Sequence, residues 1–168
     1  MADLNQEALE GLAAELGAVL LARGMMLAVA ESCTGGWAAQ AVTALAGSSV
    51  WFERGFVTYS NQAKMDMLGV AAATLERHGA VSEATAREMA LGALAHSRAE
   101  AAFAISGIAG PGGGSDSKPV GTVCFAWATA AGPVRATTCR FAGDRRQVRM
   151  QAVAYAFREM RAVLVAMP

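Results

Sequence analysis

The stretch Met25–Gly36, MMLAVAESCTGG, decides the fold class of this chain. Residues Met25–Ala30 form an unbroken apolar run, which is typical of a strand buried on both faces of a sheet. The segment Thr34–Gly36 then opens an alanine-rich helix that we expect to run to about Ala46. A buried strand followed at once by a helix indicates an α/β protein, and the break between the two elements falls at Ser32.

The same alternation continues on both sides of this stretch. Apolar residues at three- and four-residue spacing predict a preceding helix over about Leu4–Arg23. The other predicted elements are a β-rich run at Val50–Tyr59, a short helix capped by Asn61, a helix over Ser82–His96, strands over Ala101–Ser106, Val120–Thr129 and Val134–Phe141, and a C-terminal helix from Asp144. The last two strands are close enough to pair as an antiparallel hairpin, and Asp144 with Gln147 makes a capping box.

This order of elements predicts a three-layer α/β/α sandwich around a mostly parallel, mixed sheet of about five strands. We find no internal repeat and no interdomain linker, and therefore expect a single domain over residues 1–168.

The composition excludes several classes of protein. The chain has 54% hydrophobic and 17% charged residues, and its acidic and basic residues cancel, so we expect neither a nucleic acid polymer nor a membrane as partner. Three cysteines far apart argue against a disulfide framework and a structural zinc site, and we predict no metal. The N-terminus lacks the pattern of an export signal, which favours a cytoplasmic location. The abundant apolar residues suggest a homodimer.

Three unusual segments directly follow predicted strands. The first is Glu31–Gly36, in which Ser32 lies on the strand-to-helix turn beside amides that suit an oxyanion or a phosphate. The alternative is that the serine only caps the helix. The segment has neither the G-x-S-x-G nor the S-x-x-K pattern, so a base for Ser32 has to come from elsewhere.

The second segment, Thr58–Lys64, carries a candidate base. A helix beginning near Asn61 places Lys64 in its first turn, with Tyr59 on the strand that enters it. A lysine that is partly removed from water can deprotonate a serine, and a tyrosine can stabilise or shuttle protons. Taken alone, the segment fits a solvated surface lysine better than a catalytic one.

The third segment, Ser106–Gly114, is rich in glycine and follows a predicted buried strand. Glycines let the backbone approach a ligand closely and present its amides. The order of residues matches neither a Walker A loop nor a dinucleotide fingerprint. A fourth candidate, Arg145 at the start of the last helix, has the guanidinium geometry that suits a phosphate or carboxylate. Sheets of this class bind ligands at the carboxyl ends of their strands, so the segments are expected to meet there.

Taken together, six motifs closely resemble the CinA carboxyl-terminal domain family. They are AESCTGG at 30–36, GSSVWFERGFVTYSNQAK at 47–64, LGV at 68–70, HGAVSEATAREMA at 78–90, SGIAGPGGGSDSKPVGTV at 106–123 and GDRRQVR at 143–149. The resemblance spans about residues 4–164. It implies deamidation of nicotinamide mononucleotide to nicotinic acid mononucleotide and ammonia, in pyridine nucleotide salvage.

The resemblance also implies roles for individual residues. Ser32 carries over as the nucleophile of a serine amidohydrolase, Lys64 as its general base and Tyr59 as a supporting catalytic residue. The substrate and oxyanion sites would be shaped by Thr34, Gly35, Gly36, Ser106, Gly107, Gly110, Gly112, Gly113 and Arg145. The partner is then a small-molecule nucleotide, and no cofactor is needed.

Two alternatives remain open from the sequence. One is a catalytically silent nucleotide-binding module that has kept the pocket. The other makes Cys33 the nucleophile, because a thiolate at a helix start is activated, although the sequence offers it no histidine partner.

Overall fold

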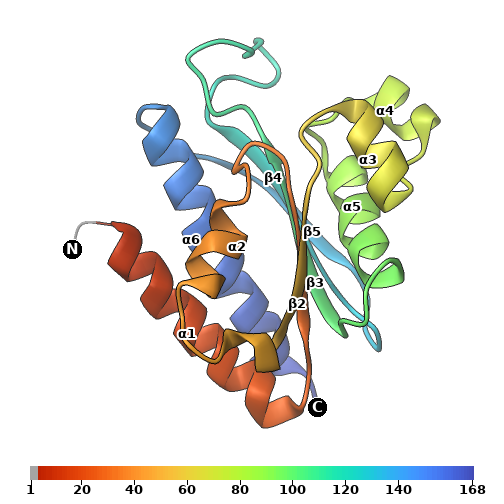
Figure 1. The fold of residues 1–168 in the computed structure, drawn as a ribbon. Coiled ribbons are helices and arrows are strands. Elements are labelled where there is room, and N and C mark those ends of the chain that lie inside the picture. The colour runs from red at the N-terminus through yellow and green to blue at the C-terminus, as the bar shows by residue number, and fades with distance from the viewer. Residues whose placement is uncertain (1–3) are drawn as a thin grey trace.

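A computed structural model, which describes residues 4–168, has one five-stranded sheet between two layers of helices (Figure 1). The strands are β1 (Leu27–Glu31), β2 (Phe52–Val57), β3 (Ala101–Gly107), β4 (Thr122–Thr129) and β5 (Arg135–Arg140). The helices are α1 (Gln6–Arg23), α2 (Trp37–Thr43), α3 (Asn61–Leu68), α4 (Ala72–His78), α5 (Glu83–Ala95) and α6 (Arg145–Ala166), with a 3-10 turn at Ser48–Val50. The predicted three-layer α/β/α sandwich is confirmed.

The strand order in the sheet is β2-β1-β3-β4-β5. β1 pairs in parallel with β2 and β3, whereas β4 pairs antiparallel with β3 and β5. The sheet is therefore mixed, as predicted, but divided evenly between the two kinds of pairing, because the predicted hairpin forms β4 and β5. The chain runs from β1 to its neighbour β2 and later enters β3, which lies on the other side of β1. A crevice therefore opens beyond the carboxyl end of β1.

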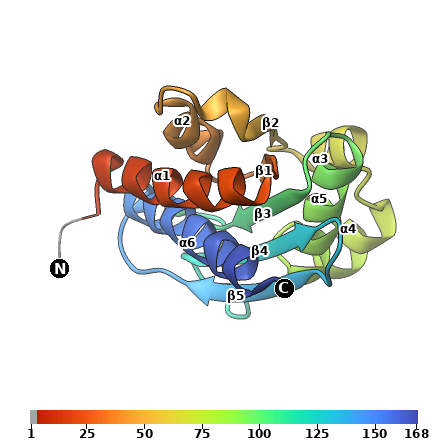
Figure 2. The same ribbon diagram turned by 90° about the horizontal axis from the view of Figure 1, so that it is seen from below.

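Alternate side chains of β1 pack on opposite layers. Leu27 and Val29 lie in a core shared with α1, α2 and α6, and Ala28 and Ala30 lie in a second core with α5. In Figure 1, α1, α2 and α6 lie on one side of the sheet and α3, α4 and α5 on the other, and in Figure 2 α1 and α6 lie side by side. The central strand is thus held from both faces, which fixes the position of its carboxyl end.

Some boundaries differ from those predicted. The helix after Ser32 begins at Trp37 and ends at Thr43, because Gly35 and Gly36 have positive φ angles of 60° and 97° and make a turn instead. The cap of α3 is Ser60, whose side chain accepts the N–H of Ala63. Helix α4 was not predicted. The capping box at the start of α6 is confirmed.

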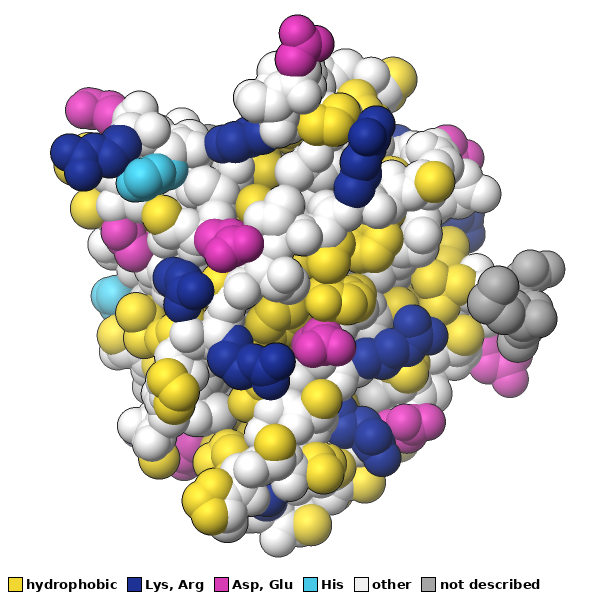
Figure 3. All heavy atoms as spheres, turned by 180° about the vertical axis from the view of Figure 1, so that it is seen from behind, with side chains coloured by type: hydrophobic (Ala, Val, Ile, Leu, Met, Phe, Trp, Pro, Cys, Tyr) yellow, Lys and Arg dark blue, Asp and Glu magenta, His cyan; other side chains and the backbone are white. Residues whose placement is uncertain are grey.

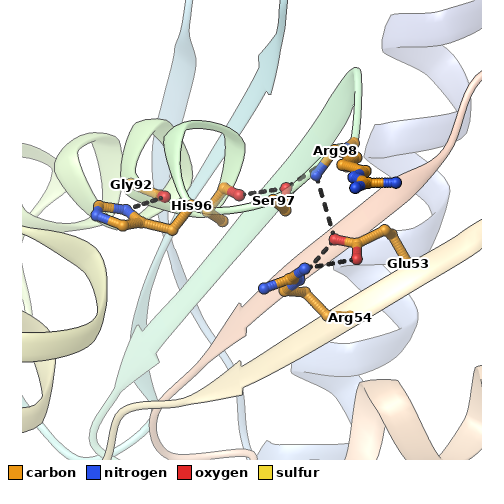
Figure 4. A network of polar contacts seen from close by, with 8 residues as sticks. Glu53, Arg54, Gly92, His96, Ser97 and Arg98 are labelled. Carbon is orange, nitrogen blue, oxygen red and sulfur yellow. Dashed lines mark hydrogen bonds and ion pairs between the residues drawn. The ribbon is translucent and has the colours of Figure 1, made fainter.

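A separate polar cluster lies at the amino end of β2, away from the crevice (Figure 4). The Glu53 carboxylate accepts two hydrogen bonds from the Arg54 guanidinium, at 2.6 and 2.8 Å, and one from the Arg98 backbone N–H. It joins the edge strand to the turn between α5 and β3. The cluster belongs to the opposite end of the sheet from the predicted site residues.

Basic and acidic side chains are interspersed on the face in Figure 3, with no field of one sign. In residues 4–168 we find no helix that combines the length and apolar character needed to cross a bilayer. In the same residues, no group of three or more His, Cys, Asp and Glu side chains is arranged to hold a metal ion.

Candidate active site

A cavity of about 330 Å³ lies at the carboxyl ends of β1 and β3. It is lined by Ser32, Cys33, Tyr59, Lys64, Ala80, Val81, Ser106, Gly107, Ile108, Ala109, Gly110, Gly112, Gly113 and Arg145. A larger hollow of about 480 Å³ between α1 and α6 is bordered by residues such as Val19 and Arg161 and contains no predicted site residue. The chemistry of the lining therefore favours the smaller cavity.

Ser32 and Lys64 are in direct contact in this cavity. The Lys64 ammonium nitrogen Nζ lies 3.0 Å from Ser32 Oγ and 2.8 Å from the backbone oxygen of Thr58. Lys64 is only 1% exposed, and this burial lowers the pKa of its side chain from the ordinary value of 10.5. An amine with a lowered pKa, within hydrogen-bond distance of a hydroxyl, is suited to general-base catalysis.

The parallel pairing of β1 with β2 brings these two residues together. Ser32 directly follows β1, and the chain leaving β2 is tied to it because the Thr58 N–H donates to the backbone oxygen of Glu31 at 2.8 Å. Ser60 then caps α3, so the first turn of that helix projects Lys64 back toward the end of β1. Adjacent strand ends thus bring into contact two residues that lie 32 positions apart in the sequence.

Arg145 and Tyr59 lie on the rim of the cavity. Arg145 Nη1 donates to the Gly110 backbone oxygen at 2.8 Å, and its Nη2 donates to the Tyr59 hydroxyl at 3.3 Å. Tyr59 is 66% exposed. The guanidinium therefore connects the glycine segment with the loop between β2 and α3.

Ser106 lies deeper, at the end of β3. Its buried hydroxyl donates to the Ala80 backbone oxygen at 2.7 Å. This bond fixes Ala80 and Val81, which form part of the cavity wall and were not predicted. In the structure the Ser106 hydroxyl contacts this wall, whereas the prediction was a substrate contact.

Three predicted substrate-binding residues, Thr34, Gly35 and Gly36, are absent from the cavity lining. The Thr34 hydroxyl donates to Glu31 at 2.6 Å, and the Gly36 N–H donates to the same carboxylate at 3.1 Å. The Gly35 N–H donates to the Ser32 backbone oxygen at 3.1 Å. These donors are engaged inside the protein, and the role of the three residues in shaping the substrate and oxyanion sites stays a prediction.

Two charged residues near Ser32 were missed. The fully buried Glu31 carboxylate accepts four hydrogen bonds, from the Thr34 hydroxyl and from the backbone N–H groups of Gly36, Ala38 and Ala39. Arg149 of α6 donates to the backbone oxygens of Cys33 and Thr34 at 2.9 and 3.0 Å. Both residues lie inside motifs that carry the family resemblance. Their place in these motifs was the only sign in the sequence that they could matter.

The electrostatics of the lining favour an anionic ligand. Its two basic side chains are those of Lys64 and Arg145, and no carboxylate of residues 4–168 lines the cavity. Burial, reinforced by the charge of Glu31, raises the pKa of the Cys33 thiol to about 11. The thiol is thus held in its neutral form near pH 7, which weakens the case for a cysteine nucleophile.

Comparisons with known proteins agree with this description. The sequence model of the family described as the CinA C-terminal domain matches residues 9–164. The Nicotinamide-nucleotide amidohydrolase PncC of Escherichia coli K12 is 58% identical over 149 residues, which cover 89% of this chain and 90% of that protein. The protein of the same name from Enterobacter agglomerans is 53% identical over 152 residues, covering 90% and 93%.

A solved structure is similar as well. The crystal structure of the competence damage-inducible protein A (ComA) from Klebsiella pneumoniae superposes with a TM-score of 0.91 and 44% sequence identity. The match covers 95% of this chain and 99% of that one. The architecture is therefore shared over nearly the whole chain.

Proposed function

The chain belongs to the CinA C-terminal domain family, and from this premise we propose that it is an amidohydrolase acting on nicotinamide mononucleotide. The products are nicotinic acid mononucleotide and ammonia. The proposal draws on the relatives named as nicotinamide-nucleotide amidohydrolases, which match about nine-tenths of this chain. The observation that carries it is the buried contact of 3.0 Å between Lys64 Nζ and Ser32 Oγ.

In the proposed first half-reaction, neutral Lys64 takes the proton of the Ser32 hydroxyl while Oγ attacks the carboxamide carbon. The carbonyl π electrons move to the oxygen and give a tetrahedral intermediate with a negatively charged oxygen. The intermediate collapses, the C–N bond breaks, and the Lys64 ammonium returns the proton to the leaving nitrogen, which departs as ammonia. The nicotinoyl group is left as an ester on Ser32.

In the second half-reaction, water attacks the ester carbon and Lys64 accepts the proton of that water. The Ser32 oxygen leaves and recovers a proton from the lysine, which releases the carboxylic acid and restores the enzyme. Because the same amine serves both steps, the enzyme needs it in the neutral form at the start of each. The lowered pKa of Lys64 increases that fraction.

Substrate recognition follows from the charges and surfaces of the cavity. We infer that Arg145 and the amides of the glycine segment take the phosphate, since a guanidinium and backbone N–H groups both bind this anion well. The apolar side chains of Ala80, Val81 and Ile108 offer a wall for the pyridine ring. Tyr59, beside Arg145, would support the substrate at the mouth.

The test is ammonia release from nicotinamide mononucleotide by the purified full chain, with free nicotinamide as the control amide. We expect turnover by the wild type and none above background for Ser32→Ala. The exposed Ser49→Ala is a matched control that should keep wild-type kcat. A wild-type chain that binds the nucleotide but releases no ammonia would instead be a silent binding module, and the proposal would be wrong.

A further inference from the structure

Arg149 and Glu31 hold the turn behind the nucleophile and are not used by the mechanism above. Glu31 is 0% exposed, and its carboxylate fixes the Thr34 side chain and the start of α2. On the other side of the turn, the Arg149 guanidinium lies 5.3 Å from the centre of the Trp37 ring and donates to two backbone oxygens. The carboxylate of Glu31 and the guanidinium of Arg149 thus hold the segment Ser32–Thr34 from its two sides.

The hydrogen bonds of this turn form a chain that begins at Arg149. Its Nη2 donates to the Thr34 backbone oxygen at 3.0 Å. The N–H on the other side of that peptide belongs to Gly35 and donates to the Ser32 backbone oxygen at 3.1 Å. The N–H on the other side of the Ser32 peptide belongs to Cys33. Because the peptides are trans, each oxygen and the following N–H point in opposite directions, so fixing one end fixes the other.

The last donor in this chain belongs to a residue of the cavity wall. Cys33 lines the cavity beside Ser32, and within residues 4–168 its N–H donates to no atom of another residue. An N–H on the residue that follows a nucleophile is well placed for the oxygen that becomes charged. Hydrogen bonds in series polarise one another, so a guanidinium at the far end also strengthens this donor.

We propose that Arg149 is a positioning residue, which orients and polarises the Cys33 N–H as an oxyanion donor through the Thr34–Gly35 and Ser32–Cys33 peptides. Glu31 holds the opposite side of the same turn. The inference rests on the proposed function in one respect only, that Ser32 is the nucleophile. It does not depend on the identity of the amide substrate.

Glycine is required at position 35 for this arrangement. Its φ of 60° lies in the left-handed region, and a Cβ there would approach the Arg149 Nη2 atom to 3.4 Å. A side chain would therefore strain the Thr34–Gly35 peptide, which links the Arg149 guanidinium to the Ser32 backbone oxygen. Gly35 thus serves the conformation of the turn itself.

The experiment measures how fast Ser32 reacts with an alkyl fluorophosphonate, by mass spectrometry of the intact full chain. In this reaction Ser32 Oγ bonds to phosphorus, the P–F bond breaks, fluoride leaves, and Lys64 takes the hydroxyl proton. The developing charge on the phosphoryl oxygen needs the same donor as the amide reaction. We expect Arg149→Met to slow labelling about 10- to 100-fold, since one oxyanion donor is worth about 10²- to 10³-fold.

Two further variants separate positioning from folding. Arg149→Lys keeps the charge, but an ammonium group can donate well to only one of the two backbone oxygens. Its labelling rate should therefore lie between those of Arg149→Met and the wild type. Arg146 lies about one helical turn before Arg149 on α6 and is exposed. The labelling rate of Arg146→Met should be within about twofold of the wild-type rate. Melting curves establish which variants are folded, and if Arg149→Met is not, Arg149→Lys decides.

Ammonia release provides the second readout. With a positioning role, kcat for Arg149→Met falls by the same factor as labelling, while KM stays within about twofold. Wild-type labelling rates in folded Arg149→Met and Arg149→Lys would overturn the inference, as would a raised KM at unchanged kcat. If the wild type labels at Ser32 but releases no ammonia, the proposed function fails and the labelling rates still test Arg149.

Discussion

The two sides of the cavity are built differently. On one side, Ser32, Cys33 and Thr34 are buried, and Glu31 of β1 and Arg149 of α6 engage the polar groups of this turn. On the other side, the glycine segment is exposed over Pro111–Ser117, and Arg145 ties its first part to α6 through the Gly110 backbone oxygen. One side is fixed by many internal contacts, and the other is attached at a few points.

This difference matches the tasks we assign to each side. Forming a bond at a carbon requires the nucleophile, base and oxyanion donor to be held within fractions of an ångström. Binding a phosphate needs several amides and a cation, and a glycine loop can adapt these to the ligand. Substitutions on the buried side should therefore lower kcat, whereas those in the loop should mainly raise KM.

After the loss of turnover expected for Ser32→Ala, the largest effect is expected for Lys64→Met on the buried side. Methionine fills similar space but cannot accept a proton, so kcat should fall by about 10³-fold, the usual range for a general base, with KM nearly unchanged. Stopped assays of ammonia release measure both constants. A variant with a normal kcat would show that Ser32 is activated by some other group.

The same lysine predicts a dependence on pH. Because burial lowers its pKa, kcat of the wild type should rise with pH through that lowered value and be lost as the pH falls below it. The folded state disfavours the proton that the unfolded chain binds below 10.5, so the free energy of unfolding should rise with pH up to 10.5. In Lys64→Met this part of the rise should be missing from urea unfolding curves.

How far the sequence predicted this arrangement depends on the range of the interactions. Ser32 and Lys64 could be placed together because the segments that carry them each follow a strand, and parallel neighbours end at the same edge. The contact between Arg149 and Thr34 joins residues 115 positions apart, and no local pattern encodes such a contact. Helix α4 was missed because the residue before it, Ala71, has no side chain that can cap.

The hydrogen bonds of Gly35 and Gly36 could not be predicted for a related reason. In the sequence they fit the start of a helix with amides open to a ligand, as at many phosphate sites. Only the fold places the buried Glu31 carboxylate where it takes the N–H groups at the start of α2. A carboxylate at the end of an apolar strand gives no local sign of which donors it will accept.

An intermediate effect is expected in the glycine segment, from a matched pair of substitutions. Gly110 has a φ of 84°, and a Cβ there would come to 2.5 Å from Val120 Cγ1, so Gly110→Ala should lower the free energy of unfolding by about 1–3 kcal/mol. It should raise KM several-fold by shifting the backbone that Arg145 holds. Gly112 has open space around it, and Gly112→Ala should change stability by less than about 0.5 kcal/mol.

The pair is read by urea unfolding and by initial rates over a range of nucleotide concentrations. Equal effects of the two substitutions on KM would mean that the loop binds through its flexibility alone. A loss of kcat at constant KM in Gly110→Ala would contradict the division of tasks between the two sides, because the loop would then take part in the chemical step.

The smallest effect on turnover is expected for Cys33→Ala, although this residue adjoins the nucleophile. The thiol, with a pKa of about 11 raised by burial and then by Glu31, is neutral near pH 7, and its backbone N–H is kept in the variant. We therefore expect kcat within about threefold of the wild type, with about 1 kcal/mol of stability lost through the small cavity left behind. A loss as large as that of Ser32→Ala would identify the thiol as the nucleophile. Retained activity would locate the contribution of position 33 in its peptide group, which is the part that Arg149 orients.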